Sequence, residues 1–146
     1  MSHLLDVSFL VACGWKSHAD HRAARRWLDS QTAFYTCPLT QLGFLRVSLS
    51  PAFRATLEDA RTILEELTTV KAARFVADTL SATYLPPLNS AGDVTDAYFV
   101  ALAREARLLL ATLDDDLCQK PWASGVAVNP LRSASADLPH ATAEAR

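Results

Sequence analysis

Short apolar runs alternate along the chain with longer stretches whose apolar residues recur every three or four positions. A continuous apolar run is expected for a strand that is buried on both faces by helices, and LLLAT at 108–112 is the clearest example. The sequence predicts strands at 4–5, 33–37, 73–77, 108–112 and 125–129.

The stretches between these runs have the three-and-four spacing of amphipathic helices. They predict helices over 7–15, 17–30, 40–48, 55–70 and 95–106. Strands that alternate with helices predict an α/β fold, a three-layer α/β/α domain with a central, mostly parallel sheet.

The length of 146 residues favours one domain. We expect this domain to cover residues 1–131. Residues 132–146 are small and polar, contain a proline and lack an apolar period, which predicts a mobile C-terminal tail.

Composition narrows the class of protein. Lys and Arg total 14 against 16 Asp and Glu, a formal net charge of −2, so any nucleic-acid contact must come from a local patch. Three cysteines without a C-x-x-C pair indicate neither a disulfide framework nor a zinc site. No Lys or Arg precedes the first apolar stretch, Asp6 interrupts it, and no apolar run approaches the roughly 20 residues of a membrane helix. We therefore expect a cytoplasmic protein without a membrane segment.

Aspartates stand where the predicted strands end. Asp6 follows the first strand, and Asp114 follows the strand at 108–112 after one intervening residue. Asp96 lies at the start of the helix that precedes that strand. Ligands of open parallel sheets bind beyond the carboxyl ends of the strands, so we expect all three carboxylates at one crevice.

Carboxylates crowded together repel one another, and a divalent cation would neutralise them. Oxygen ligands select Mg²⁺ or Mn²⁺ over zinc, and Mg²⁺ commonly binds a substrate phosphate as well. Such a site can activate a water molecule for attack on a phosphodiester. Structural roles remain open for each residue: Asp93 or Asp96 as a helix cap, Asp6 as the cap of the next helix, and 114–116 as a solvated turn.

Four segments give the chain a family resemblance: LLDVSFLVA (4–12), PLTQLGFLRV (38–47), VTDAYFVALA (94–103) and LLATLDDDL (109–117). In this order they resemble the motifs of PIN-domain ribonucleases, specifically the VapC toxins of type II toxin–antitoxin systems. The resemblance spans about residues 3–131. It implies a PIN fold, Mg²⁺- or Mn²⁺-dependent endonucleolytic cleavage of RNA, a homodimer, and a cognate VapB-like antitoxin that holds the enzyme inactive.

The resemblance also assigns roles by motif. Asp6, Asp96 and Asp114 match the first, third and fourth acidic positions, which are catalytic and bind the metal. Ser8 and Thr112 match small hydroxyl residues that support these ligands.

Gln41 occupies the second position, where the family usually has Glu. Its neutral carbonyl can still hold a metal-bound water, but the site loses one negative charge. Metal binding is then weak, or Asp93, Asp115 or Asp116 compensates.

The favoured function is a metal-dependent endoribonuclease toxin. The RNA is not identified by the sequence; transfer RNA, cut in an anticodon stem-loop, is the first candidate, and ribosomal and messenger RNA are alternatives. Gln41 keeps open a catalytically weakened PIN module that acts by binding RNA or antitoxin. Aspartyl-phosphate chemistry fits poorly, because Asp6-Val7-Ser8 is not a D-x-D motif.

The remaining candidates are basic and aromatic residues. Basic residues that could flank the crevice and contact RNA phosphates, or simply form solvated helix faces, are Lys16, Arg22, Arg25, Arg26, Arg46 and Arg54. We interpret His18 and His21 as surface residues, and Trp15 and Trp27 as core residues that could alternatively dock an antitoxin helix.

Overall fold

The computed structural model describes residues 1–132, so the predicted tail lies, apart from Arg132, outside the described residues. The strands are β1 (His3–Leu5), β2 (Phe34–Thr36), β3 (Ala73–Phe75), β4 (Leu109–Ala111) and β5 (Ala127–Val128). The helices are α1 (Val7–Gly14), α2 (His21–Asp29), α3 (Pro38–Ser48), α4 (Leu57–Thr69), α5 (Val94–Glu105) and α6 (Asp115–Gln119). Short 3₁₀ turns are η1 (Ala82–Tyr84), η2 (Ala91–Asp93) and η3 (Pro121–Ala123).

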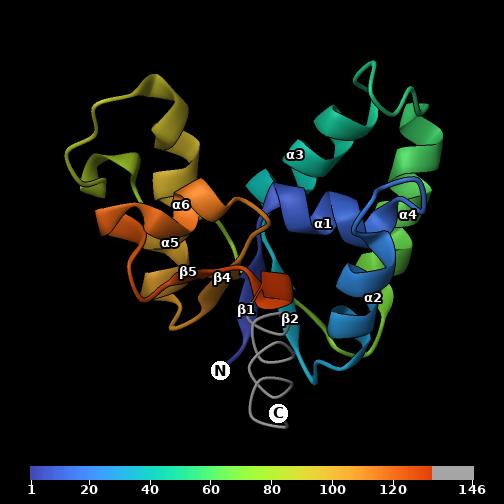
Figure 1. Ribbon diagram of the computed structural model, residues 1–146, viewed down its shortest axis with the longest axis horizontal. Helices are drawn as coiled ribbons and strands as arrows, with labels where there is room; N and C mark the ends of the chain where they lie inside the picture. Colours follow the sequence, from blue (N-terminus) through green and yellow to red (C-terminus); the bar gives the residue numbers. More distant parts are fainter. Residues whose placement is uncertain (133–146) are drawn as a thin grey trace, which may run out of the picture.

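The strands form a five-stranded sheet in the order β3-β2-β1-β4-β5, and every neighbouring pair is parallel. β1 lies in the middle, with β2 on one side and β4 on the other. The predicted α/β class is therefore confirmed. The carboxyl ends of the strands all lie at one edge, the upper edge in Figure 1.

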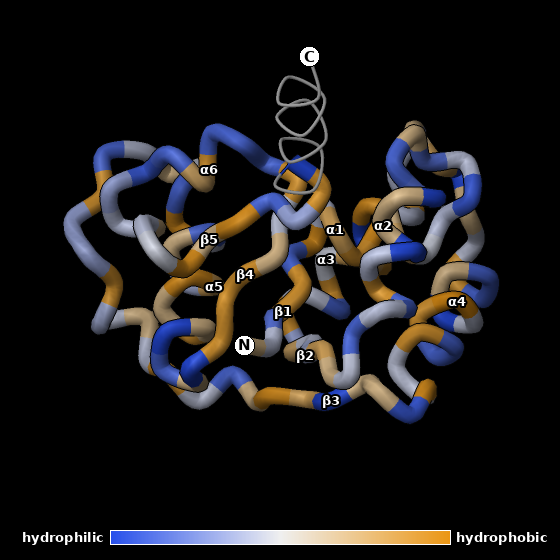
Figure 2. Tube along the Cα trace, turned by 60° about the horizontal axis from the view of Figure 1, so that its bottom comes forward, coloured by the Kyte–Doolittle hydropathy of each residue, from blue (hydrophilic) through white to orange (hydrophobic). Residues whose placement is uncertain are grey.

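Helices cover both faces of this sheet, with α1 to α4 on one side and α5 and α6 on the other (Figure 1). Successive side chains of a strand point to opposite faces. Accordingly, Leu5 and Ala111 pack into the cluster with α1 to α4, whereas Leu4 and Leu110 pack into the cluster with α5 and α6. All four side chains are fully buried, and β4 is hydrophobic along its length in Figure 2.

Two helices differ from the expectation. α2 begins at His21 rather than near residue 17, because the preceding residues form turns in which the His18 imidazole accepts the Asp20 N–H. α6 was not predicted: residues 114–116 resemble a solvated turn, but Asp114 caps a five-residue helix that is too short to show an apolar period. Among residues 1–132, no helix is long and apolar enough to cross a membrane.

Candidate active site

Three aspartates reach the carboxyl edge of the sheet from three elements. Asp6 follows β1 and caps α1, where its Oδ1 accepts the Val7 N–H at 2.8 Å. Asp114 follows β4, the neighbour of β1, and caps α6 by accepting the Leu117 N–H at 3.2 Å. Asp96 lies in the first turn of α5. The cap role considered for Asp6 is therefore real, and Asp114, considered as part of a solvated turn, is a helix cap as well. Both caps orient their carboxylates at this edge.

Asp6 is held in place by two hydroxyl groups. The Thr112 hydroxyl donates to Asp6 Oδ2 at 2.7 Å, and the Ser8 hydroxyl lies 3.3 Å from the same oxygen. The backbone N–H groups of Leu113 and Asp114 in turn donate to Ser8 Oγ and Thr112 Oγ1. This network ties the end of β1 to the end of β4, which is the supporting role expected for the two hydroxyls.

Burial strongly affects the Asp6 carboxyl group, which is only 5% exposed. Desolvation raises its pKa, the bonds from Thr112, Val7 and Ser8 oppose this effect, and the charge of Asp114 adds to it. A buried carboxylate that is both desolvated and close to another acid gains from a cation nearby.

Asp96 lies in a strongly perturbed environment. Its side chain is half-buried, and its pKa is raised to about 6, first by desolvation and then by the charges of Asp6, Asp114 and Asp93. No hydrogen bond to its carboxylate comes from the described part of the chain. Because Asp114 raises the pKa of Asp6, and both of these acids raise the pKa of Asp96, the three carboxylates form one electrostatic site.

The donor set fits a hard divalent cation. An ionised carboxylate offers about four lone-pair sites. Asp6 uses three of them, Asp114 uses one, and Asp96 uses none within residues 1–132, so oxygen lone pairs remain on all three. Within the same residues, no three His, Cys, Asp or Glu side chains are gathered closely enough to hold a metal ion. The three acids thus offer the oxygen ligands that a hard cation prefers, but they do not by themselves surround one position as a complete set of ligands.

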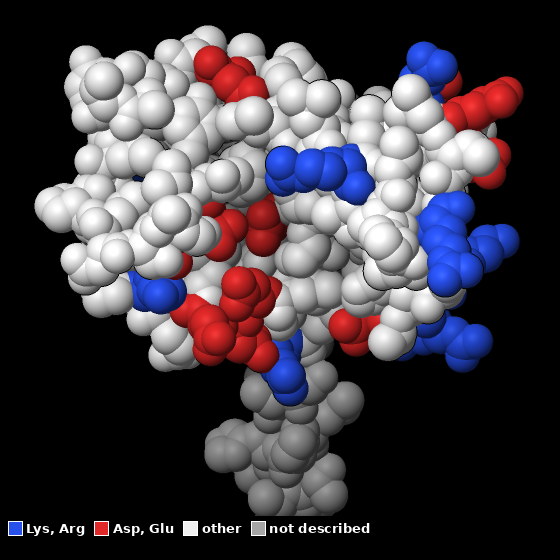
Figure 3. Space-filling model, turned by 90° about the horizontal axis from the view of Figure 1, so that it is seen from above, with Lys and Arg blue, Asp and Glu red and all other residues white. Residues whose placement is uncertain are grey.

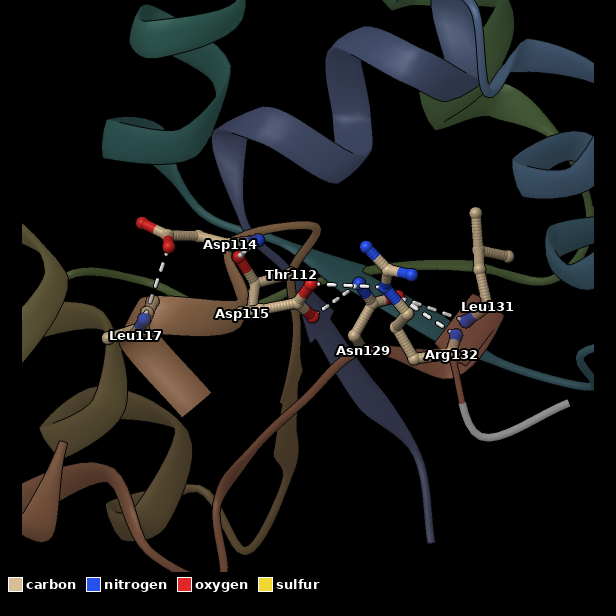
Figure 4. Close-up of polar contacts among 7 residues, drawn as sticks. All are labelled: Thr112, Asp114, Asp115, Leu117, Asn129, Leu131 and Arg132. Carbon is tan, nitrogen blue, oxygen red and sulfur yellow. Dashed lines mark hydrogen bonds and ion pairs between the residues drawn. The ribbon is translucent and has the colours of Figure 1, made fainter. Parts of the chain in front are cut away.

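Two of the three proposed compensating acids already have cationic partners. Asp93 lies 3.6 Å from Lys120 Nζ. The Asp115 carboxylate accepts hydrogen bonds from Arg132 Nε at 3.0 Å and from Asn129 Nδ2 at 3.1 Å (Figure 4). Asp116 is exposed on α6. Asp93 and Asp115 are therefore less available as a fourth ligand than the sequence suggested.

Gln41 lies in the first half of α3, which follows β2 at the same sheet edge. Its Nε2 donates to Thr36 Oγ1 at 3.0 Å, at the end of β2. The structure therefore places Gln41 at the expected edge, but joins it to a strand end rather than to any of the three aspartates.

The predicted basic residues do not form one surface around the site. Arg25 pairs with Asp29 on α2, while Lys16 and Arg25 line a groove between α2 and α4. Arg46 is the exception, since it lines a groove with Val7 and Thr95, the residues next to Asp6 and Asp96.

The aromatic candidates are packed as predicted. The Trp15 indole donates to Ser48 Oγ at 2.8 Å and packs beside Phe44, and Trp27 makes an edge contact with Phe9. His21 Nδ1 contacts the Ala12 carbonyl oxygen at 2.8 Å, so it is a half-buried residue rather than a plain surface residue.

The sequence interpretation missed two cations beside the site, Lys120 and Arg132. Neither is part of a motif, and each meets its acidic partner only through the fold. Figure 3, which looks onto the carboxyl edge of the sheet, shows acidic side chains gathered around a hollow with basic side chains beside them.

Comparisons with known proteins agree with this architecture. The PIN domain family model matches residues 3–123, and the chain belongs to this family.

Within the family it belongs with the VapC ribonucleases. Ribonuclease VapC38 of Mycobacterium tuberculosis is 39% identical over 118 residues, covering 76% of this chain and 84% of the relative. Ribonuclease VapC39 of the same species is 34% identical over 148 residues, covering 88% and 99%.

A solved structure shares the fold. The crystal structure of Mycobacterium tuberculosis VapC20, described as a sarcin-ricin loop cleaving toxin, superposes with a TM-score of 0.60. The alignment covers 80% of this chain and 92% of VapC20 at 15% sequence identity.

Proposed function

We propose that this chain is a metal-dependent endoribonuclease toxin and that Asp6, Asp96 and Asp114 form the active site at which it cleaves RNA. The observation that carries the proposal is the position of these three carboxylates beyond the ends of two neighbouring parallel strands, where Asp114 raises the pKa of Asp6 and both of them raise the pKa of Asp96. The ribonuclease names of the VapC relatives support the same reaction.

Asp6, Asp96 and Asp114 would hold the cofactor, Mg²⁺ or Mn²⁺. When bound, the cation supplies a polarised water molecule and positive charge for the scissile phosphate. Asp6 is the rigid member, because Ser8 and Thr112 fix its carboxylate. Asp96, which accepts no hydrogen bond from residues 1–132, is the member most able to turn toward an incoming cation.

Two classes of RNA are candidate substrates. Transfer RNA remains the first candidate, and the description of VapC20 as a sarcin-ricin loop cleaving toxin makes a ribosomal RNA loop the second. Sequencing the new 5′ ends after incubation with total bacterial RNA distinguishes them: ends within anticodon stem-loops support the first, and ends within ribosomal RNA support the second.

We further propose that the protein acts in the cytoplasm as a homodimer and is inhibited by a VapB-like antitoxin. Exposed apolar side chains support a protein partner on α3 and at the start of α5: Leu39 is 39% exposed, Leu42 60% and Val94 44%. Expression of the chain alone should arrest bacterial growth, and a cognate antitoxin should relieve the arrest by mass action.

A weakened PIN module that only binds RNA or antitoxin is the second candidate. Gln41 favours it, because this residue contributes no charge and is bonded to Thr36. The deciding experiment incubates purified protein with RNA in EDTA, in EDTA followed by excess Mg²⁺, and in Mg²⁺ alone. Loss of cleavage in EDTA and recovery with Mg²⁺ support the enzyme; equal RNA binding without cleavage in all three supports the module.

A further inference from the structure

Two ion pairs border the acidic site, one at each end of α6. At the C-terminal end, Lys120 Nζ lies 3.6 Å from Asp93 Oδ2, next to the first turn of α5. At the N-terminal end, Arg132 Nε donates to Asp115 Oδ2 at 3.0 Å. The described residues contain one further ion pair, and that pair links successive turns of α2.

Neither cation is saturated by its partner. The Lys120–Asp93 distance exceeds hydrogen-bond length, so the three N–H donors of the ammonium group remain available. Arg132 uses only Nε within residues 1–132, which leaves the four N–H groups of its two terminal nitrogens. The side chains are 40% and 74% exposed, so a ligand can reach both.

Both cations are held close to the catalytic carboxylates. Lys120 ends the helix that Asp114 caps, and Asp115, the partner of Arg132, is the next residue after Asp114. α6 has five residues and is therefore roughly 7.5 Å long, short enough for one RNA strand to contact both of its ends.

Arg132 has a defined orientation. Asn129 Oδ1 accepts the backbone N–H of Arg132, while Asn129 Nδ2 shares the Asp115 carboxylate with the guanidinium group (Figure 4). A guanidinium group fixed at Nε presents its terminal nitrogens as a planar fork, the geometry that matches phosphate oxygens.

We propose that Lys120 and Arg132 bind backbone phosphates on the two sides of the scissile bond, so that the RNA strand runs along α6 past Asp114. This proposal deepens the proposed function and rests on it for the identity of the ligand. Cations on both sides of an acidic site offset the repulsion between its carboxylates and the polyanion. Their contacts are with phosphates, so they fix the position of the strand and do not read its sequence.

The test is RNA binding in EDTA, where metal-dependent cleavage cannot occur. A short, fluorescein-labelled single-stranded RNA is titrated with Lys120→Met, Arg132→Met, the double variant and the parent at several salt concentrations. For single strands, each lost phosphate contact lowers the slope of log affinity against log salt by about 0.7, so the double variant should lose about 1.4. Lys120→Arg should keep the parental slope.

Lys71→Met is the matched control for charge. Lys71 is exposed and precedes β3, at the opposite edge of the sheet, so its loss should leave the slope unchanged. Asp115→Asn and Asp116→Asn form a second pair: both remove one negative charge from α6, but only the first frees a cation. The first should tighten RNA binding more than the second.

Parental slopes in both Met variants, with lower melting temperatures, would show that the ion pairs only stabilise the fold. Failure of the parent to bind RNA in EDTA at low salt would also overturn the proposal, because neither cation needs the metal. These outcomes are independent of catalysis. If the parent cleaves RNA but the Met variants keep the parental slope, only the proposed phosphate contacts are refuted. If the variants lose slope as predicted but the parent never cleaves RNA, only the proposed endoribonuclease activity is refuted.

Discussion

Asp96 is a site residue whose ionised form the fold supports with no described hydrogen bond. The Asp6 carboxylate accepts three hydrogen bonds, whereas Asp96 is half-buried, accepts none from residues 1–132 and faces three other acids. An acid of this kind opposes folding when ionised and gains from any cation that binds there.

The pKa of Asp96 predicts how stability depends on pH without metal. It rises from 3.8 in the unfolded chain to about 6 in the fold. A raised pKa means that the folded state binds the proton more tightly, so protonation of Asp96 stabilises the fold. This stabilisation is complete below the unfolded pKa of 3.8 and is lost as the pH rises through the folded pKa of about 6. Asp96→Asn should therefore raise the melting temperature at pH 7.5 more than at pH 4.5, measured in EDTA with Asp116→Asn as control. An equal effect at both pH values would contradict the assigned environment.

Gln41 gives a second prediction at this scale. Gln41→Glu places a negative charge near the acidic site, and affinity for hard cations follows the charge of the ligands. Calorimetric titration should show tighter Mg²⁺ or Mn²⁺ binding than in the parent, and the metal-free variant should melt at a lower temperature that Mg²⁺ restores. Unchanged affinity would mean that position 41 does not face the metal and remains only a partner of Thr36.

At the scale of elements, the packing of α1 against α3 positions Asp6. A Cβ atom built at Gly43 of α3 would overlap Cγ2 of Val7, the first residue of α1, whose N–H binds Asp6. Only a residue without a side chain allows this approach. Gly43 thus affects the site indirectly, because it lets Val7, and with it Asp6, lie close to α3.

Gly43→Ala should consequently disturb both folding and catalysis. Overpacking of this kind costs about 1–3 kcal/mol of stability, and the displacement of Val7 should move the Asp6 carboxylate and slow RNA cleavage. Gly92→Ala is the control, because its nearest neighbour, Ser90 Oγ, lies at an ordinary contact distance of 3.5 Å. Denaturant titration and cleavage rates check both variants; equal behaviour would show that α1 and α3 can separate without consequence.

Elements with a strong pattern could be predicted from the sequence, and those defined by tertiary contacts could not. The run at 108–112 contains β4, and the spacing at 55–70 contains α4. α6 has no period of its own and depends on the Asp114 cap.

The same distinction applies to the site. Asp6 directly follows an apolar run, and Asp114 follows another after one intervening residue, so their shared edge could be inferred from the sequence. The partners of Lys120 and Arg132 lie 27 and 17 residues away, and only the fold brings them together.

At the scale of the whole molecule, the acidic site and the exposed apolar residues of α3 lie near each other. Leu39 and Leu42 of α3 line a groove with Thr95, the neighbour of Asp96. A partner on this surface would border the substrate path, and a homodimer formed there would place two acidic sites in one assembly.

Leu42→Glu tests the proposed homodimer. A charge at the exposed centre of this apolar surface should shift the protein from dimer to monomer in sedimentation equilibrium, because burying an unpaired carboxylate is unfavourable. Leu57→Glu, an exposed leucine of α4, should leave the mass unchanged. If the parent is already monomeric, or Leu42→Glu remains dimeric, the interface lies elsewhere.

The most direct test of the acidic site is single-turnover RNA cleavage in Mg²⁺ by Asp6→Asn, Asp96→Asn and Asp114→Asn beside Asp116→Asn. Each variant loses one carboxylate charge, but only the first three lose a member of the site. We predict that these three cleave more than about 100-fold more slowly than the parent, since the charge that a bound metal contributes is worth several kcal/mol. Asp116→Asn should cleave at nearly the parental rate. Near-parental cleavage by any of the three would remove that residue from the site, and equal loss in all four would show that bulk charge, rather than a metal-dependent centre, controls the reaction.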